Sequence, residues 1–276
     1  FISLIPKLDE FWASTIFPIL IEEIGKSSSS NIVLIHALIS MCSVLPIESR
    51  IIILEKIFLV ALLSINEKDR IELFELMKPT LFNDEIIERL LQTITPHLYD
   101  SCLQVRLKAI EILLLSQDEN AKKEVDNFLE QQLIILENSL PGPSQLDAAY
   151  CIRTVFTRIN PSPEQSSRFV GQMNTFISNF KQHCSGIHVK TLACYVEIFD
   201  SLVRRYLIDD EEILLANINT FMGIAKWTSN KRIVLSILRF IDTVTSIFSP
   251  SKIKTKKPLA QNLIRIGRRM YSDKCS

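Results

Sequence analysis

The sequence predicts an all-α fold, a right-handed α-solenoid of about six antiparallel helix pairs followed by a C-terminal helix. The first observation is that only 6 of the 276 residues are Gly, whereas about 7% is average. Phosphate loops, β-bulges and tight turns need Gly, and helices do not. The second is the spacing of the apolar residues, and the third is the shortness of the breaks between the helical stretches. With 47% apolar residues, the chain can bury a large core.

Apolar residues recur with the period of an amphipathic helix. In residues 104–115, Val105, Ala109, Ile112 and Leu113 fall on one face, which is the i, i+4, i+7 pattern of a half-buried helix. Residues 189–202 and 233–248 repeat this pattern. No stretch keeps the strict alternation of a half-buried strand for long, and no Asn-Gly or Asp-Gly hairpin signal occurs. The periodicity therefore indicates helices throughout.

The breaks between these stretches predict where the helices begin. Asn83, Asp118 and the Asp209–Glu212 run are typical of helix N-termini, Ser144 is predicted to cap the helix after Pro141-Gly142-Pro143, and Pro163 is tolerated in a first turn. Connections of mostly two to six residues make consecutive helices antiparallel. We expect one repeat array over residues 1–249 and a basic segment with a capping helix over 250–276. The predicted helices cover residues 8–24, 31–45, 48–64, 67–78, 84–95, 102–116, 119–139, 145–159, 163–182, 187–207, 210–227, 230–248 and 258–271.

One segment carries a family pattern. Pro96–Ser101, with Asp100 in the turn, followed by Val105-Arg106 and Ala109, resembles the HEAT consensus. Weaker echoes at Ala149, Val189 and Val234 give spacings of 44, 40 and 45 residues from Val105 onward, inside the ~40–47 of HEAT and armadillo repeats. The resemblance implies a stack of helical hairpins from about residue 8 to residue 249. It implies no catalytic residue.

The sequence offers little for chemistry. His183, Cys184 and Cys194 are the one Cys/His cluster, and they lack the paired short spacing that structural zinc sites use. No Ser lies in a G-x-S-x-G turn, and no Gly-rich loop offers oxyanion or phosphate donors. We therefore expect no enzyme activity, no metal and no cofactor. The six scattered Cys are expected to be reduced core thiols of an intracellular protein.

The ends of the chain carry further expectations. Because the chain starts at Phe1 rather than at Met, we expect a piece of a longer protein. No uncharged run reaches the ~20 residues that a membrane span needs. Residues 251–276 hold eight Lys/Arg and one Asp, a net charge of +7, which leaves about −7 for the rest.

This basic tail has several interpretations. Its cluster of cations suits a nuclear-import signal, contact with phosphates or anionic lipid, or docking on an acidic partner. Alternatively, the helix at 258–271 ends the solenoid and its charges are solvated. The import interpretation favours the nucleus over the cytoplasm. The candidate residues of the cluster are Lys252, Lys254, Lys256 and Lys257.

Three further candidates for partner binding are Trp227, Lys231 and Arg232. Trp concentrates binding energy at interfaces, and Trp227 is predicted in a turn beside the two cations. That turn is similar to those which the TOG class of HEAT arrays presents to tubulin, although the other predicted turns lack basic residues. Four cations on second helices either contribute to a binding surface, or are solvated, or form ion pairs with neighbouring repeats, namely Arg106, Arg153, Lys190 and Arg232.

The predicted function is a non-enzymatic scaffold or adaptor that presents a helical-repeat surface to protein partners within a larger complex. The alternative is a nucleic-acid or chromatin-associated module that uses the basic tail. A groove binder for nucleic acid would spread Lys and Arg over many repeats, whereas the body of this chain is net acidic.

Overall fold

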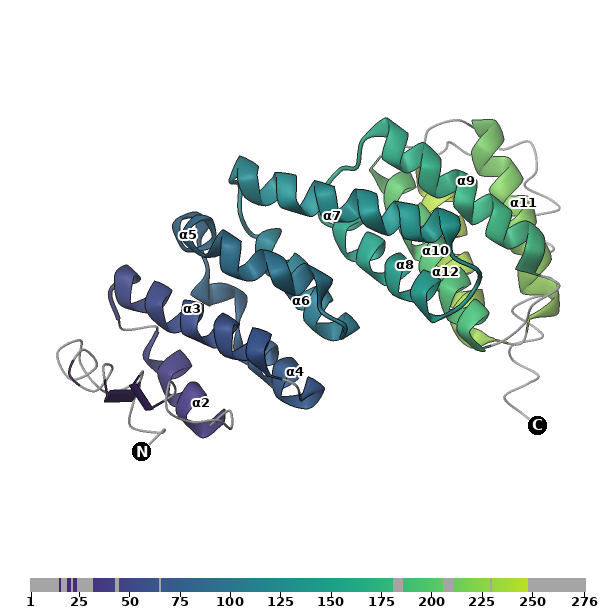
Figure 1. Cartoon of the computed structure of the whole chain (residues 1–276). Helices are drawn as coiled ribbons and strands as arrows, with labels where there is room; N and C mark the ends of the chain where they lie inside the picture. The colour runs from purple at the N-terminus through teal and green to yellow at the C-terminus, as the bar shows by residue number, and fades with distance from the viewer. Residues whose placement is uncertain are drawn as a thin grey trace. The chain divides into compact units, whose positions relative to one another are not determined.

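The computed structural model describes residues 15, 19–20, 22–23, 32–42, 45–64, 66–180, 186–205, 211–228 and 230–247. Helix is the one type of regular secondary structure across these residues (Figure 1), which confirms the predicted all-α class. The chain forms two compact units, residues 1–128 and 129–276. The boundary falls inside helix α7 (Glu119–Asn138). One continuous array over residues 1–249, and its handedness, remain predictions.

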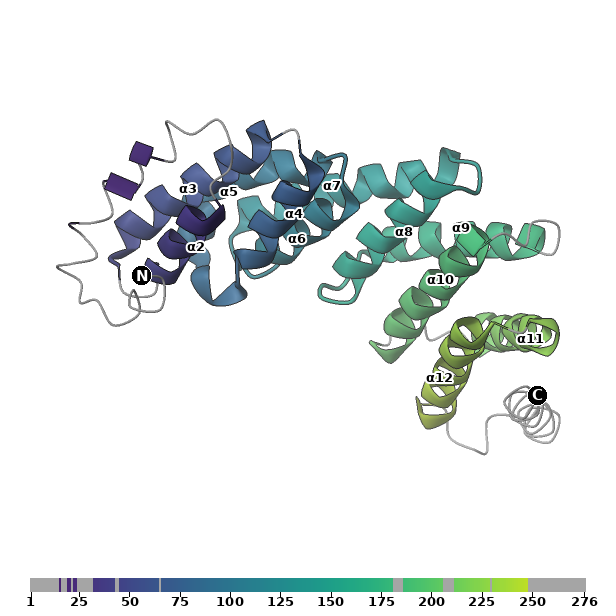
Figure 2. The same ribbon diagram turned by 90° about the horizontal axis from the view of Figure 1, so that it is seen from below.

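Unit 1 consists of two rows of helices. Helices α2, α4 and α6 follow one another in the first row, and α3 and α5 lie side by side in the second (Figures 1 and 2). Across the rows, α3 contacts both α2 and α4, and α5 contacts α6, so hairpins pack on their neighbours as a helical repeat requires. The elements are α2 (Ile32–Met41), α3 (Ile47–Leu63), α4 (Glu67–Leu76), the 3-10 turn η2 (Pro79–Leu81), α5 (Asp84–Ile94), the 3-10 turn η3 (Thr95–Tyr99) and α6 (Leu103–Leu113).

Unit 2 repeats the arrangement with longer helices. Helix α10 lies between α8 and α12 in one row, while α9 contacts α10 and α11 contacts α12 from the other side (Figure 2). The elements are α8 (Pro143–Phe156), α9 (Pro163–Phe180), α10 (Gly186–Arg204), α11 (Glu211–Trp227) and α12 (Lys231–Ile247). Every predicted helix between residues 31 and 248 therefore exists. The predicted helix at 258–271 and most of the one at 8–24 lie outside the described residues.

Aromatic side chains fill the space between the rows. In unit 1, Phe58 of α3 meets Phe74 of α4 edge to face, with ring centroids 5.6 Å apart. In unit 2, Phe199, Phe221 and Phe240 bring α10, α11 and α12 together at centroid distances of 5.2–6.2 Å. All five rings are almost completely buried. Burial of several such rings in each unit is a main source of its stability.

The helix starts follow the predictions with one exception. Asn83 Oδ1 accepts a hydrogen bond from the backbone N–H of Ile86, and Asp118 caps α7 in the same way. The prediction for Ser144 was wrong, because α8 begins one residue earlier at Pro143 and has no side-chain cap. Pro has no N–H to satisfy at the first helical position, so this helix needs fewer capping bonds.

The register between α8 and α10 differs from the sequence echoes. Ala149, Val189 and Val234 do lie in successive helices of one row, as predicted. However, the Cys194 thiol donates to the Ala149 carbonyl at 3.3 Å, 45 residues away. Ala149 is thus level with Cys194 and not with Val189, so the predicted register in α10 was wrong by about one turn. Within the described part of the chain, no helix is both long enough and apolar enough to cross a membrane.

Candidate protein-binding surfaces

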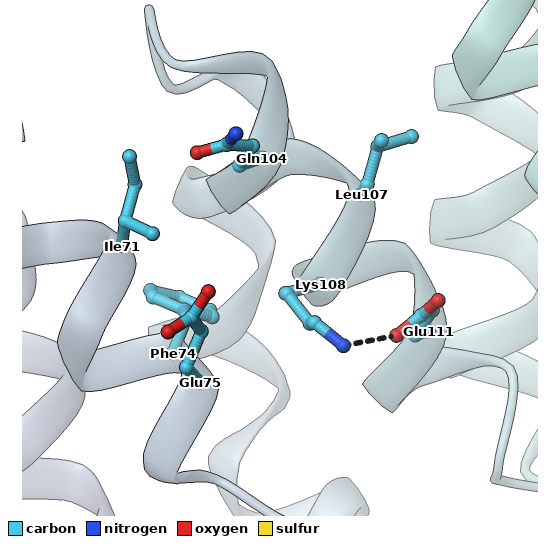
Figure 3. Close-up of a pocket in the computed structure, with 7 residues that line it drawn as sticks. All are labelled: Ile71, Phe74, Glu75, Gln104, Leu107, Lys108 and Glu111. Carbon is cyan, nitrogen blue, oxygen red and sulfur yellow. Dashed lines mark hydrogen bonds and ion pairs between the residues drawn. The ribbon is translucent and has the colours of Figure 1, made fainter.

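A groove opens between α4 and α6 in unit 1 (Figure 3). Its volume is about 210 Å³, below the ~300–1,000 Å³ typical of small-molecule and cofactor sites. Ile71 of α4 and Leu107 of α6 form its apolar walls, both partly exposed, and Phe74 lies at its base. A space of this size and polarity suits one apolar side chain of a partner protein.

The base of the groove is held by the core behind it. Phe74 packs edge to face on the ring of His97 at 4.9 Å and on Phe58 at 5.6 Å. His97 is fully buried, and its Nε2 lies 3.1 Å from the carbonyl oxygen of Phe58. Burial lowers the pKa of His97, which keeps the ring neutral. The groove is therefore shaped before any partner binds, which lowers the entropy cost of binding.

An ion pair holds α4 and the start of α6 together at one end of the groove. Arg70 Nε lies 3.0 Å from Asp100 Oδ2, and both side chains are about nine-tenths buried. Asp100 Oδ1 also accepts the backbone N–H of Cys102 at 2.7 Å, directly before α6. Arg106 donates to the backbone carbonyl of Asp100 at 2.8 Å. Asp100 thus joins α4 to the start of α6, and Arg106 bonds the backbone directly before α6.

The rim of the groove is charged. Lys108 Nζ pairs with Glu111 Oε2 at 2.9 Å along one side (Figure 3). Glu75 stands on the other side, exposed and without an ion pair to any residue that the structure describes. Gln104 completes the lining from the first turn of α6. The rim therefore has a net charge of −1.

The predicted candidates near residue 230 are only partly where the sequence placed them. Trp227 is the last residue of α11, as the predicted helix 210–227 has it, and it lies directly before the turn that was predicted to contain it. The helix continues because its own ladder extends to the Thr228 N–H, which bonds the Ile224 carbonyl. Lys231 and Arg232 open α12, are exposed, and follow Asn230, which caps that helix. The side chain of Trp227, and the tail residues Lys252, Lys254, Lys256 and Lys257, lie outside the described part.

Second-helix cations mostly take part in contacts between neighbouring helices. Arg153 of α8 donates to Glu197 of α10 at 2.7 Å, and Arg232 of α12 approaches the same carboxylate at 3.7 Å. Lys190 is exposed in the first turns of α10. Arg153 and Arg232 thus take part in ion pairs between neighbouring helices, whereas Arg106 donates to backbone carbonyls just before its own helix.

The candidate metal residues offer no site in the described part. Among those residues, no group of three or more His, Cys, Asp or Glu side chains is arranged to hold a metal ion. Cys194 is fully buried, and this burial raises the pKa of its thiol to about 12. The thiol is therefore protonated and acts as a small core residue. His183 and Cys184 lie outside the described residues.

Comparison with known proteins gives structural likeness alone. No protein-family profile matches the chain, and no characterised protein sequence does. An engineered protein solved by crystallography is similar, with a TM-score of 0.47 and 13% identity over 83% of this chain and 98% of its own. Computationally designed armadillo repeat proteins for modular peptide recognition are similar with a TM-score of 0.44 and 10% identity, over 82% of this chain and 99% of theirs. A designed armadillo repeat protein in complex with the peptide (KR)4 is similar with a TM-score of 0.44 and 12% identity, over 82% of this chain and 98% of its own.

The fold defines the class of protein. The described residues form an all-α protein in which helical hairpins stack in two rows within each unit.

Proposed function

We propose that this chain is a non-enzymatic scaffold that binds a partner protein through the groove between α4 and α6. The observation that carries the proposal is the pre-shaped apolar groove itself, with Phe74 at its base and Ile71 and Leu107 on its walls. Its size favours a single side chain rather than a metabolite. Apolar pockets with charged rims are typical of the centres of protein interfaces.

The rim narrows the kind of partner. Glu75 is exposed without an ion pair to a described residue, and the rim as a whole is negative. A partner segment that inserts one apolar side chain and carries a Lys or Arg beside it complements both features. We therefore propose that short segments of this composition occupy the groove. Membership of a larger complex and a nuclear location remain predictions.

The test is selection of displayed random peptides on the whole protein. Peptides that use the groove should bind wild type and lose binding when Leu107→Glu places a charge on its wall. Leu140→Glu is the matched control, because Leu140 is 87% exposed and lies in the loop before α8. Glu75→Lys should select against peptides with a basic neighbour. If the peptides selected on wild type bind the Leu107→Glu protein equally well, the groove is not the binding site.

A further inference from the structure

Charge in unit 2 is divided unequally between its two rows of helices. The row of α8, α10 and α12, with the residues that directly follow α8 and α10, comprises residues 143–160, 186–205 and 231–247. It holds eight Lys/Arg against four Asp/Glu, a net charge of +4. The remaining helical segments of the unit, 129–138, 163–180 and 211–227, hold two against five, a net charge of −3. We call the first row's solvent side the basic face, formed by Arg153, Arg158, Lys190, Arg204, Arg205, Lys231, Arg232 and Arg239.

Helical spacing collects these cations on the solvent side. In α12, Arg232, Leu235 and Arg239 stand at i, i+3 and i+7 and are all exposed, whereas Ile233 and Ile237 are buried. In α10, Lys190, Glu197 and Arg204 stand at i, i+7 and i+14 on one face. Because α8, α10 and α12 pack side by side (Figure 2), their outer faces form one surface.

Hydrogen bonds between α8 and α10 fix this surface. Besides the pair of Arg153 with Glu197, the Ser201 hydroxyl donates to the Phe156 carbonyl at 3.5 Å. Arg205 donates to the Ile159 carbonyl at 2.6 Å, just after α8 ends. These contacts join α8 and α10 at three levels along their length.

The acidic residues on the face do not balance its cations. Glu197 is shared by two arginines, and Asp200 pairs with Arg204 at 2.9 Å. Three cations make no ion pair with any residue that the structure describes, namely Lys190, Lys231 and Arg239. All three are exposed and drawn from α10 and α12. The surplus charge is available to a ligand.

We propose that the basic face binds an acidic segment of a partner protein. A peptide can place its carboxylates opposite the surplus cations and avoid the acidic side chains between them, and Arg binds carboxylates in a bidentate manner. Nucleic acid presents a phosphate about every 1.7 Å along a duplex, so Glu197, Asp200 and Asp242 would repel it. Leu235, 49% exposed between Arg232 and Arg239, adds an apolar contact. This surface lies in unit 2 and is separate from the α4–α6 groove.

The experiment measures fluorescence anisotropy of a labelled 12-residue peptide of Asp, Glu and Leu, titrated with the whole protein. The face variant is Lys190→Glu/Lys231→Glu/Arg239→Glu. Its matched control is Lys56→Glu/Lys68→Glu/Lys123→Glu, which changes the net charge equally at exposed positions of α3, α4 and α7. A tail variant, Lys252→Ser/Lys254→Ser/Lys256→Ser/Lys257→Ser, removes the other basic cluster.

We expect the face variant to bind the acidic peptide at least about tenfold more weakly, because three favourable charge contacts become repulsive. The control and the tail variant should change it by less than about threefold. Equal weakening in the face variant and its control overturns the proposal, as does loss of binding in the tail variant alone. Tighter binding of a single-stranded RNA of equal charge to the same face overturns it in favour of nucleic acid.

Thermal melting of each variant separates binding from folding. The three altered cations are exposed, so the melting temperature should hold. If the face variant melts lower than its control, Lys190→Gln/Lys231→Gln/Arg239→Gln replaces it, since neutralisation adds no repulsion. Wild-type affinity in that milder variant overturns the proposal. The Leu107→Glu groove variant should bind the acidic peptide normally, so failure of the two binding proposals can be told apart.

Discussion

Removing the carboxylate of Asp100 tests whether the ion pair with Arg70 holds α4 and α6 together. Asp100→Ala deletes the partner of a guanidinium that is about nine-tenths buried, and it deletes the acceptor of the Cys102 N–H. Arg70 also donates to the Ser64 carbonyl at 3.0 Å and to Ser101 Oγ at 3.2 Å. Those two hydrogen bonds remain in the variant, but their acceptors are uncharged and do not neutralise the guanidinium.

The expected cost follows from these losses. Breaking a buried ion pair by removing one partner costs about 3–5 kcal/mol, chiefly because the other charge stays buried. The bonds that Arg70 keeps reduce this cost, while the lost hydrogen bond to the Cys102 N–H adds about 1 kcal/mol. We expect the free energy of unfolding of unit 1 to fall by about 3–4 kcal/mol. Asp100→Asn keeps an acceptor for the Cys102 N–H, so it should cost about 1 kcal/mol less.

A double-mutant cycle isolates the pair. Arg70→Met alone leaves Asp100 without its cation, but Arg70→Met/Asp100→Ala leaves no buried charge at this position. The double variant should therefore be more stable than the sum of the two single losses predicts, by about 2 kcal/mol or more. Because the chain has two compact units, thermal melting of the whole protein would report the unfolding of both units together. Hydrogen exchange of α4 and α6 amides, measured by mass spectrometry against α9 and α11, reports on unit 1 alone.

Two results would refute this reasoning. A loss below about 1 kcal/mol in Asp100→Ala would mean that water reaches Arg70 and that the pair behaves as a surface ion pair. Additive losses in the cycle would mean that the two side chains act separately. Faster exchange in α9 and α11 as well as in α4 and α6 would mean that the change is not confined to unit 1.

Two other buried polar side chains, those of His97 and Tyr195, give predictions about the stability of the two units. Burial lowers the pKa of His97, so the unfolded chain binds more protons than the folded one below about pH 6.5. Stability of unit 1 should be complete above that pH and fall as the pH drops toward the folded-state pKa, by up to about 1.4 kcal/mol per pH unit. The free energy of opening of α3 and α4 amides, obtained from hydrogen exchange after correction for the intrinsic pH dependence of exchange, should lack this dependence in His97→Leu. An equal dependence in the variant would contradict the assignment. The Tyr195 hydroxyl is buried without a hydrogen-bond partner among the described residues, against the rings of Phe169 and Phe176. Tyr195→Phe should leave unit 2 as stable or stabilise it by about 1 kcal/mol, whereas Tyr195→Ala should cost about 3–5 kcal/mol through the cavity it leaves. A clear loss of thermal stability in Tyr195→Phe would show that the hydroxyl has a partner.

Much of the fold follows from local pattern. The apolar period of residues 104–115 predicts α6, and Asn83 and Asp118 predict the starts of α5 and α7, because caps and amphipathic faces are set by residues near in sequence. The start of α8 was missed by two residues, 143 instead of 145, since Pro143 and Ser144 both suit the first turn and the cap signal of Ser144 competes with the Pro signal.

Register and binding surfaces depend on residues far apart in sequence, and the sequence predicts them less well. Echoes of the repeat pattern gave a spacing of 40 residues from Ala149 to Val189, but the contact of Ala149 with Cys194 gives an offset of 45 residues between α8 and α10. The α4–α6 groove was missed altogether. Ile71 and Leu107 are 36 residues apart, and no motif marks either one. Lys231 and Arg232 were predicted from their charge and their place beside Trp227, whereas nothing in the sequence marked Glu197, which lies near Arg232.

The position of Glu197 explains why the basic face and the stability of unit 2 are linked. Its carboxylate contacts Arg153 of α8 and approaches Arg232 of α12, so one acidic side chain of α10 meets cations from both neighbouring helices. An acidic segment bound at Lys190, Lys231 and Arg239 would add negative charge beside the same three helices, and would reduce the repulsion among their surplus cations. Binding to the folded state alone raises its stability by RT ln(1 + [L]/Kd), about 2.7 kcal/mol at a ligand concentration of 100 Kd. Hydrogen exchange in α8, α10 and α12 should therefore slow when the acidic peptide binds, and exchange in α4 and α6 should not.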